Sequence, residues 1–351
     1  MPPTAKPHPA TGSGAPADQP SAHATRRLLG VVVGLAVVVV VMLCAFALPS
    51  INSGPHRVPL GLAGPQQAVQ AIQSGLDKDA WTVAVYPDDK ALTAAITSRD
   101  IVGGLAVAPQ GVTVYTASAA GSPTTAAITA MGNGLAVRQQ TTSTVHDVVP
   151  LPAGDPRGAG FTAAALPMLI GGVLPAVALL RLFPGHAGLR RRLVGVLAFA
   201  LVAGFAVTAV LQYGFGSLNG AYWLTALGVS LGMAALAVPF LGLESLFGFG
   251  GLGVGAAVMM LLGNPLSGFA GPYWLPTGLA TVGQLLPPGS SGSLLRANAF
   301  FDGVGAAGPA LVLAAWVLAG LILIVIADRR TAHNPEHPHR PHTEALEPAA
   351  P

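Results

Sequence analysis

The feature that most constrains this chain is a series of long apolar runs without charged residues. Crossing the hydrocarbon core of a bilayer takes roughly 20 residues of apolar helix, and several runs reach that length. Over the whole chain 52% of the residues are hydrophobic and 9% are charged, against roughly 25% charged residues in soluble domains. The sequence therefore predicts an α-helical polytopic membrane protein, embedded in the lipid bilayer, with about six transmembrane helices.

The N-terminal region has the pattern of a tail followed by a membrane anchor. Residues 1–25 are rich in Pro, Ala, Gly, Ser and Thr, which predicts a disordered cytoplasmic tail. Residues 26–49 begin with two arginines and continue as an unbroken apolar run, which favours a first transmembrane helix. A positive flank before an apolar run is also typical of a cleaved signal peptide, but the apolar part of such peptides is about 7–15 residues long.

Residues 50–160 differ from the rest, because charges of both signs and turn residues alternate with short β-branched stretches. We predict an inserted α/β extracytoplasmic domain with the order β-α-β-β-α-β. The expected elements are strands at 81–86, 101–108, 112–117 and 142–149, and helices at 90–98 and 122–139. Asp88 or Asp89 is expected to cap the first helix, and Ser122 the second. The chain's one cysteine, Cys44, precedes this domain, which therefore lacks an internal disulfide.

Residues 161–330 return to the membrane pattern and predict a five-helix membrane domain. The expected spans are 161–182, 193–213, 221–243, 245–263 and 309–327, with Glu244 in the turn between the third and fourth of these. Juxtamembrane arginines gather at 26–27, 181–192 and 329–330, and the positive-inside rule places all three groups in the cytoplasm. The expected product is a multi-pass protein of the cell (plasma) membrane, with N-terminus and C-terminus cytoplasmic.

The residues that are missing limit the possible functions. Apart from Arg26, Arg27 and Arg181 at their ends, the expected spans carry no Asp, Glu, Lys, Arg or His, whereas ion-coupled carriers usually need ionisable groups at membrane depth. The three lysines, Lys6, Lys78 and Lys90, do not follow a glycine, so the sequence has no P-loop with which to use ATP. Basic residues beside hydrophobic runs orient helices, which argues against nucleic acid as a partner. If the chain transports a substrate, the energy must come from another polypeptide.

One stretch, residues 248–253, matches the G-x-G-x-x-G fingerprint of dinucleotide sites. It lies in an apolar span and has no strand before it, so close helix packing is the favoured interpretation. Gly251 and Gly255 add a G-x-x-x-G spacing on the same helix, and we expect both to serve helix packing. No cofactor is predicted.

No pattern indicates catalysis or a specific metal site. His146 beside Asp147 is typical of a surface pair at a strand edge, so we expect the chain not to be an enzyme. The tail 331–351 is rich in His and Pro and predicts a disordered cytoplasmic segment. Its histidines are spaced among prolines, which does not favour a metal site: His333, His337, His339 and His342.

Residues 264–308 are too polar for another span and too apolar for an ordinary loop. One interpretation is a loop that faces the lipid headgroups. The other is an outer re-entrant segment, formed by two half-helices that close the mouth of a translocation path. Ser290 or Ser291 is expected to cap a helix over 292–301. The residues expected to build the re-entrant element are Pro287, Pro288, Gly289, Arg296, Phe300 and Phe301.

The segment 284–303, QLLPPGSSGSLLRANAFFDG, resembles the stretch before the last helix of ABC-2 type transporter permeases. The likeness is to the YhgE/Pip-like branch that is common in actinobacteria. Residues 91–121 resemble the outer domain of that branch, although the outer domain here is far shorter. The resemblance implies a permease subunit that forms a homodimer, or a heterodimer with a similar permease, and works with a separate nucleotide-binding ATPase subunit, usually for export. The only inner loop long enough for docking an ATPase carries Arg181, Arg190, Arg191 and Arg192.

The sequence leaves three candidate functions for this chain. The first is the permease subunit of an ABC-type exporter, which moves a hydrophobic or amphipathic substrate. The second is a non-transporting envelope scaffold or binding protein that displays its α/β domain outside the cell. The third, a membrane-embedded enzyme, lacks a catalytic constellation.

Overall fold

The computed structural model describes residues 22–51, 54–185, 188–269 and 271–333, and the chain divides into two compact units. The first unit ends at Cys44, and its described part is most of helix α1 (Ala22–Ile51). The second unit begins at Ala45 and holds the sheet and all the other described helices. The two predicted tails fall largely outside the described residues. Their inner ends are helical, because residues 22–25 belong to α1 and residues 331–333 to α11 (Ala307–His333).

Within the described residues, five helical segments are long and apolar enough to cross a membrane. These segments are Thr25–Cys44, Ala159–Leu182, Leu189–Gly214, Tyr222–Gly263 and Ala307–Arg330. The second comprises α5 (Ala159–Ala163) and α6 (Ala165–Leu182), and the third comprises α7 (Leu189–Ala209) and the π-helical turn η3 (Val210–Gly214). These five segments confirm the prediction of a helical membrane protein.

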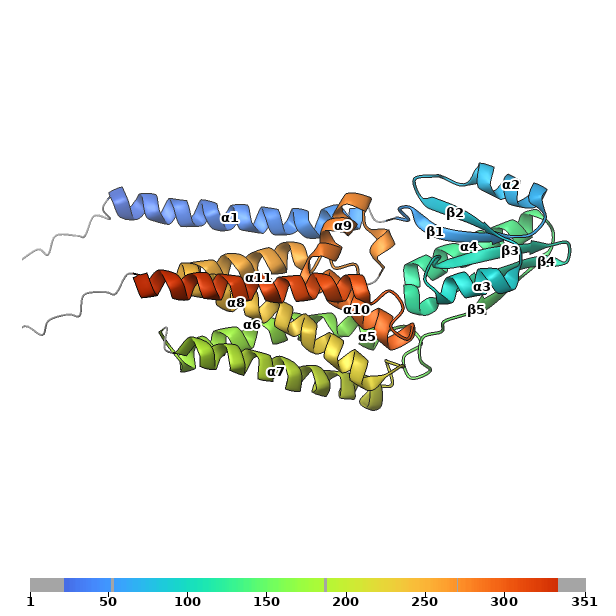
Figure 1. Ribbon diagram of the computed structural model, residues 1–351. Helices are drawn as coiled ribbons and strands as arrows, with labels where there is room; N and C mark the ends of the chain where they lie inside the picture. Colours follow the sequence, from blue (N-terminus) through green and yellow to red (C-terminus); the bar gives the residue numbers. More distant parts are fainter. Residues whose placement is uncertain (1–21, 52–53, 186–187, 270, 334–351) are drawn as a thin grey trace, which may run out of the picture. The chain divides into compact units, whose positions relative to one another are not determined.

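The fourth segment reverses direction within its length. It consists of α8 (Tyr222–Val258) and the π-helical turn η4 (Met259–Gly263). Gly248 has φ of 65° and ψ of −155°, a combination that is essentially restricted to glycine. A Cβ added at Gly255 would lie 2.7 Å from Leu243 Cδ1, so residues on the two sides of Gly248 meet. Helix α8 is therefore two antiparallel arms, which run side by side in Figure 1.

The position of this reversal corrects the prediction. The expected turn was at Glu244, because a charged residue between two apolar runs usually marks a loop. Glu244 instead continues the first arm as helix, and the chain turns at Gly248, where the backbone adopts a conformation that other residues avoid. The first glycine of the apparent dinucleotide fingerprint is thus the residue that reverses the chain.

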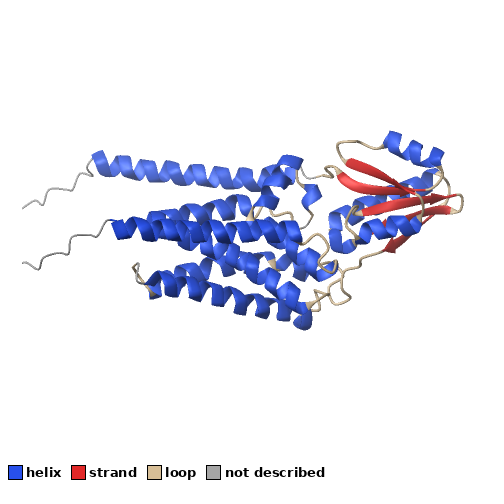
Figure 2. Cartoon of the chain, in the orientation of Figure 1, coloured by secondary structure: helices blue, strands red, loops and turns tan. Residues whose placement is uncertain are grey.

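Residues 58–147 contain a five-stranded mixed sheet with the order β2-β1-β3-β4-β5. Its strands are red in Figure 2 and labelled in Figure 1. The strands are β1 (Val58–Ala63), β2 (Trp81–Tyr86), β3 (Gly103–Ala108), β4 (Gly111–Thr116) and β5 (Thr142–Asp147). The helices are α2 (Gln66–Gly75), α3 (Asp89–Thr97) and α4 (Ser122–Arg138), with a 3-10 turn η1 (Ser118–Ala120). Strand β3 pairs antiparallel with β4, while the pairs β1–β2, β1–β3 and β4–β5 are parallel.

Two apolar clusters hold this domain, one on each face of the sheet. In the first cluster, Val69 of α2 and Ile128 of α4 pack with Leu105 and other strand residues. In the second cluster, Leu92 and Ile96 of α3 pack on the opposite face. The sheet is therefore covered on both sides, as expected for an α/β layer domain.

The long connection after residue 264 contributes aromatic side chains to both clusters. Tyr273 and Trp274 pack against the first cluster. Phe300 and Phe301 belong to the second, in which Phe301 is buried. The core of the α/β domain is thus completed by residues that lie far from it in the sequence.

The predicted elements of this domain are confirmed, but the prediction omitted β1 and α2. Strand β1 contains Pro59 and Gly61, and proline is rarely found in a central strand. Here the backbone carbonyl of Pro59 accepts a hydrogen bond from Val102, so the strand pairs without the missing N–H. Asp88 caps α3 through the amide of Ala91 at 2.7 Å, as expected. Ser122 is not a cap, because α4 begins at Ser122 itself and Gly121 precedes it.

Candidate functional site

The connection between the fourth and fifth apolar segments folds as a helical hairpin. After a 3-10 turn, η5 (Pro272–Trp274), come α9 (Thr277–Leu285) and α10 (Pro287–Phe300). Twelve residues of α10 are buried, namely Pro287 to Gly292 and Leu294 to Ala299. A helix of this length is about 21 Å long at 1.5 Å per residue, too short to cross a hydrocarbon core of about 30 Å.

The start of α10 differs from the prediction. Neither Ser290 nor Ser291 caps it, because the helix begins at Pro287 after an extended Leu286. Proline suits the first turn of a helix, where a backbone N–H has no intrahelical partner. The hydroxyl of Ser290 instead donates to the Gln284 carbonyl at 2.6 Å, which ties α10 back to α9. Gly289 lies against the Gly283 carbonyl with no room for a side chain.

The apolar helices α5 to α8 and α11 form a helical block. The hairpin enters and leaves this block on the side of the α/β domain. Its tip at Leu286 packs in the same apolar cluster as Phe240 and Met259 of the α8–η4 segment. The indole Nε1 of Trp316 in α11 donates to the Leu285 carbonyl at 2.9 Å. The open end of the hairpin is held by Phe300 and Phe301, which pack in the core of the α/β domain. The re-entrant interpretation of this hairpin stays a prediction.

Arg296 of α10 links the hairpin to the α/β domain. Its side chain is 4% exposed. Its Nε donates to the Ala119 carbonyl of η1 at 3.1 Å, and its Nη2 donates to the Phe269 carbonyl. The guanidinium lies 4.8 Å from the ring centroid of Phe161. Among the described residues, no carboxylate pairs with this arginine. Burial lowers the pKa of Arg296 to about 10, so the group remains protonated at neutral pH.

A second arginine, Arg99, lies in the same region, where the hairpin meets the α/β domain. This region is called the junction below. It is the residue after the C-cap of α3, with φ of 63°. Its N–H donates to the Ile96 carbonyl and the N–H of Asp100 donates to the Ala95 carbonyl, which is the Schellman arrangement that usually has glycine at this position. The guanidinium donates to the Val304 carbonyl at 2.9 Å and lies 5.0 Å from the Phe301 ring centroid. Burial lowers the pKa of Arg99.

Arg99 lines a cavity of about 580 Å³ between the α/β domain and the hairpin. The α/β side contributes His56, Arg57 and Arg99, and the other walls come from η5, α9, α10 and the start of α11. Backbone pairing closes one side, since the N–H of His56 donates to the Tyr273 carbonyl at 2.9 Å. The remaining lining residues are Pro272, Leu275, Thr277, Ala280, Thr281, Gln284, Leu285, Ser290, Ser293, Gly308, Pro309 and Val312.

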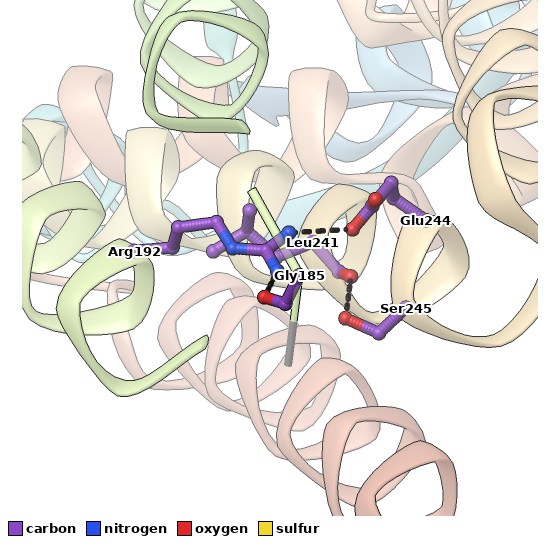
Figure 3. Close-up of polar contacts among 5 residues, drawn as sticks. All are labelled: Gly185, Arg192, Leu241, Glu244 and Ser245. Carbon is purple, nitrogen blue, oxygen red and sulfur yellow. Dashed lines mark hydrogen bonds and ion pairs between the residues drawn. The ribbon is translucent and has the colours of Figure 1, made fainter. Parts of the chain in front are cut away.

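At the other end of the helical block, the predicted docking arginines divide into two kinds. Arg192, in the first turn of α7, is 4% exposed. Its Nη1 contacts Glu244 Oε2 at 2.9 Å and its Nη2 donates to the Gly185 carbonyl (Figure 3). Arg181, Arg190 and Arg191 are exposed. Arg192 therefore joins the α6–α7 turn to the first arm of α8, and only the other three arginines present a free basic surface.

Gly251 and Gly255 both lie in the second arm of α8, facing the first. A Cβ at Gly251 would be 2.5 Å from the Leu243 carbonyl oxygen, and one at Gly255 would also meet Phe240 at 3.2 Å. Both positions need glycine for the two arms to approach this closely.

The remaining titratable groups named from the sequence do not form a reactive site. Asp147 accepts a hydrogen bond from the Ser118 amide at 3.0 Å, and His146 packs edge-on against Tyr115. Among the described residues, no group of three His, Cys, Asp or Glu side chains is placed to hold a metal ion. His337, His339 and His342 lie outside the described residues, and nothing is described of the His333 side chain.

Sequence reasoning missed the cavity and its basic residues. Arg57, Arg99 and Tyr273 come from distant parts of the chain and belong to no motif. The one available signal was the pair of basic residues in an otherwise uncharged context near 56–57, which is too common to indicate a site.

No protein-family model matches the sequence, and a comparison with curated proteins finds no match. The resemblance to ABC-2 type permeases therefore stays a prediction.

Proposed function

We propose that this chain is the permease subunit of an ABC-type exporter, which moves a hydrophobic or amphipathic substrate with the energy of a separate ATPase subunit. The α9–α10 hairpin, whose second helix α10 is buried, is the observation that carries the proposal. A scaffold that only displays a domain has no need of a short helix buried among its apolar segments. A permease needs an element that closes the outer end of its path and can respond to movements of the surrounding helices.

The proposed topology has six crossings, with both termini in the cytoplasm. The reversal at Gly248 supports it, because the segment Tyr222–Gly263 then runs across the membrane and back. The second arm, about 22 Å long, is shorter than the hydrocarbon core and needs the residues after Gly263 to complete its crossing. The exposed arginines Arg181, Arg190 and Arg191 then face the cytoplasm with Glu244, in agreement with the positive-inside rule. The α/β domain and the hairpin lie on the opposite side.

We further propose that Arg181, Arg190 and Arg191 dock the ATPase. Their side chains are exposed and among the described residues none of them forms an ion pair. Arg192 is left out of the docking set, because its charge is already paired with Glu244. By analogy with the resemblance, two such permeases would assemble as a homodimer or heterodimer.

Affinity purification of the full-length protein from native membranes in mild detergent, followed by mass spectrometry, tests this proposal. We expect a P-loop ATPase to copurify, and to be lost when Arg181, Arg190 and Arg191 are replaced by glutamine. A control with the same change in charge replaces Lys90, Arg138 and Arg157 of the α/β side by glutamine and should keep the ATPase. Recovery of envelope proteins without any ATPase would contradict the proposal.

That last outcome would favour the second function, an envelope scaffold or binding protein. One observation supports it independently. A groove of about 470 Å³ runs between α2 and α4 of the α/β domain, with Leu105 among its lining residues. Its walls include Ile72, Leu76, Met131 and Leu135, so an apolar segment of a partner could occupy it.

A further inference from the structure

The cavity at the junction has an uneven distribution of charge. Its α/β wall provides two arginines and a histidine, and none of its lining residues is Asp or Glu. Arg296, although outside the lining, lies close enough to Arg99 for the two charges to repel each other. Arg57 is exposed and Arg99 is half-buried, and an unpaired positive charge at a half-buried position such as Arg99 is unfavourable unless an anion compensates it.

Most donors on these arginines are free to bind such an anion. A guanidinium has five N–H donors. Arg99 uses one on the Val304 carbonyl, and the Arg57 side chain makes no hydrogen bond with any described residue. The Nδ1 of His56 donates to the Gly54 carbonyl at 2.8 Å, so its Nε2 donates to an anion when the ring is in the imidazolium form and otherwise accepts from a protonated phosphate. The hydroxyl of Tyr273 has no hydrogen-bond partner among the described residues.

Several polar groups on the helical side of the cavity already have hydrogen-bond partners. The side-chain amide of Gln284 donates to the Ser267 carbonyl at 3.2 Å and accepts from the Ser293 hydroxyl at 2.5 Å. The other residues of α9 and α11 that line the cavity include Ala280, Leu285 and Val312. The cavity therefore has a basic end with free donors, and an apolar side formed by residues of α9 and α11.

We propose that this cavity binds an acidic amphiphile, with a phosphate-bearing head group at Arg57, Arg99 and His56 and an alkyl chain along α9 and α11. Planar guanidinium groups match phosphate oxygens with paired hydrogen bonds. The volume lies within the range of about 300–1,000 Å³ that is usual for small-molecule sites. The site holds its ligand whether or not the protein transports it, so this inference goes beyond the proposed function.

The two arginines allow an unusually clean test, because both have positive φ values, 49° for Arg57 and 63° for Arg99. Glycine adopts such values without strain. The double variant Arg57→Gly/Arg99→Gly thus removes both guanidinium groups while it keeps the backbone geometry. Gln140 occupies the same position after α4, with φ of 55°, so Gln140→Gly is the matched backbone control. Arg157→Gly, at an exposed position, controls for loss of a positive charge.

The experiment measures equilibrium binding of radiolabelled dodecyl phosphate to the full-length protein in phosphatidylcholine nanodiscs, with empty nanodiscs as the blank. We expect saturable binding that unlabelled dodecyl phosphate displaces, and that inorganic phosphate or dodecanol at the same concentration does not. The double glycine variant should bind about tenfold or more weakly, since each charge-assisted contact contributes that much. Both control variants should bind like the wild type.

A second variant guards against a general structural effect. Thr281→Trp narrows the cavity from the exposed side of α9 and keeps both arginines, and it should also lose binding. Unchanged affinity in the double glycine variant would overturn the proposal. So would displacement by inorganic phosphate alone, which would indicate a simple anion site, or displacement by dodecanol, which would indicate an apolar site. These outcomes are independent of ATPase recovery, which tests the proposed function.

Discussion

Two arginines, Arg192 and Arg296, are equally buried at 4% exposure but are compensated in different ways. Arg192 pairs with the carboxylate of Glu244, so its positive charge is neutralised locally. Arg296 contacts two carbonyl oxygens and the face of Phe161, which engage two of its five N–H donors and leave its charge in place. The first arrangement fastens helices together, whereas the second also keeps the surrounding region positive. This difference separates a structural arginine from one that favours an anionic ligand nearby.

The region between the hairpin and the α/β domain does contain a buried carboxylate, but it does not serve Arg296. Asp155, 8% exposed, accepts hydrogen bonds from the amides of Ala159 at 2.8 Å and Gly160 at 2.7 Å. It therefore stabilises the start of α5, and the positive charge of Arg296 remains without an acidic partner among the described residues.

The largest effect is expected when the partner of Arg192 is removed. Glu244→Ala leaves a buried charge uncompensated, and we expect a loss of about 3–5 kcal/mol in the free energy of unfolding. Equilibrium unfolding of the purified protein in detergent measures it. The double variant Arg192→Met/Glu244→Leu should recover much of the loss, and Ser245→Ala, at the next residue, should change little. A double variant no more stable than Glu244→Ala would show that the pair does not act as described.

A smaller effect is expected for Arg296→Met, because no carboxylate is left behind. The variant loses two hydrogen bonds from a charged group, of about 1.5–3 kcal/mol each, but it also removes the unfavourable burial of the charge. We expect a net loss of about 2 kcal/mol in the same unfolding measurement. A loss as large as that of Glu244→Ala would mean that Arg296 has a partner of comparable strength, and the contrast between the two arginines would fail.

The reversal at Gly248 follows Glu244 in the same helical segment. Gly248→Ala forces a side chain into a backbone conformation that costs about 1–3 kcal/mol for residues other than glycine. Gly250→Ala is the matched control, because a Cβ there meets nothing within 4 Å. It should be neutral or slightly stabilising, since alanine favours helix. Equal stability of the two variants would contradict the reversal.

The smallest effect concerns Asp155. Burial alone raises the pKa of its carboxyl, but the hydrogen bonds from Gly160, Ala159 and Ser217 outweigh it and lower the pKa below the ordinary value. The ionised form is thus favoured in the folded protein, so its contribution is full above the unfolded pKa of about 3.9 and is lost as pH falls through the lower folded pKa. Asp155→Asn should reduce stability by about 1 kcal/mol at pH 7, because the amide keeps the shape but loses the charge that strengthens these hydrogen bonds at the helix start.

Unfolding at a series of pH values checks the sign of this effect. The difference between the wild type and Asp155→Asn should be constant near neutral pH and shrink below pH of about 4. A difference that grows as the solution becomes more acidic would contradict it.

Much of the fold could be predicted because the decisive signals are local. Uncharged runs identify membrane helices by composition alone, and β-branched stretches such as Trp81–Tyr86 identify strands. Strand β1 was missed for a physical reason, since Pro59 and Gly61 weaken the local strand signal while pairing on both sides holds the segment in the sheet.

The functional residues were harder to predict, because their roles depend on contacts between distant segments. The aromatic and arginine residues of α10 stood out in the sequence, and Arg296 does lie at the junction. The sequence alone could not distinguish Arg192 from its neighbours Arg190 and Arg191, since only the folded chain brings Glu244 to one of them. Arg57 and Arg99 likewise gain significance only from the cavity that they share with α9.

The central claim is that the chain crosses the membrane six times and so separates the exposed arginines from the α/β domain. Labelling of single cysteines by a membrane-impermeant maleimide in intact cells tests it, in a Cys44→Ser background. Thr144→Cys in β5 and Asn219→Cys before α8 should label in intact cells. Arg191→Cys and Gly250→Cys should label only after permeabilisation. Labelling of Gly250→Cys in intact cells, with Arg191→Cys still protected, would place the reversal outside the cell and contradict the account.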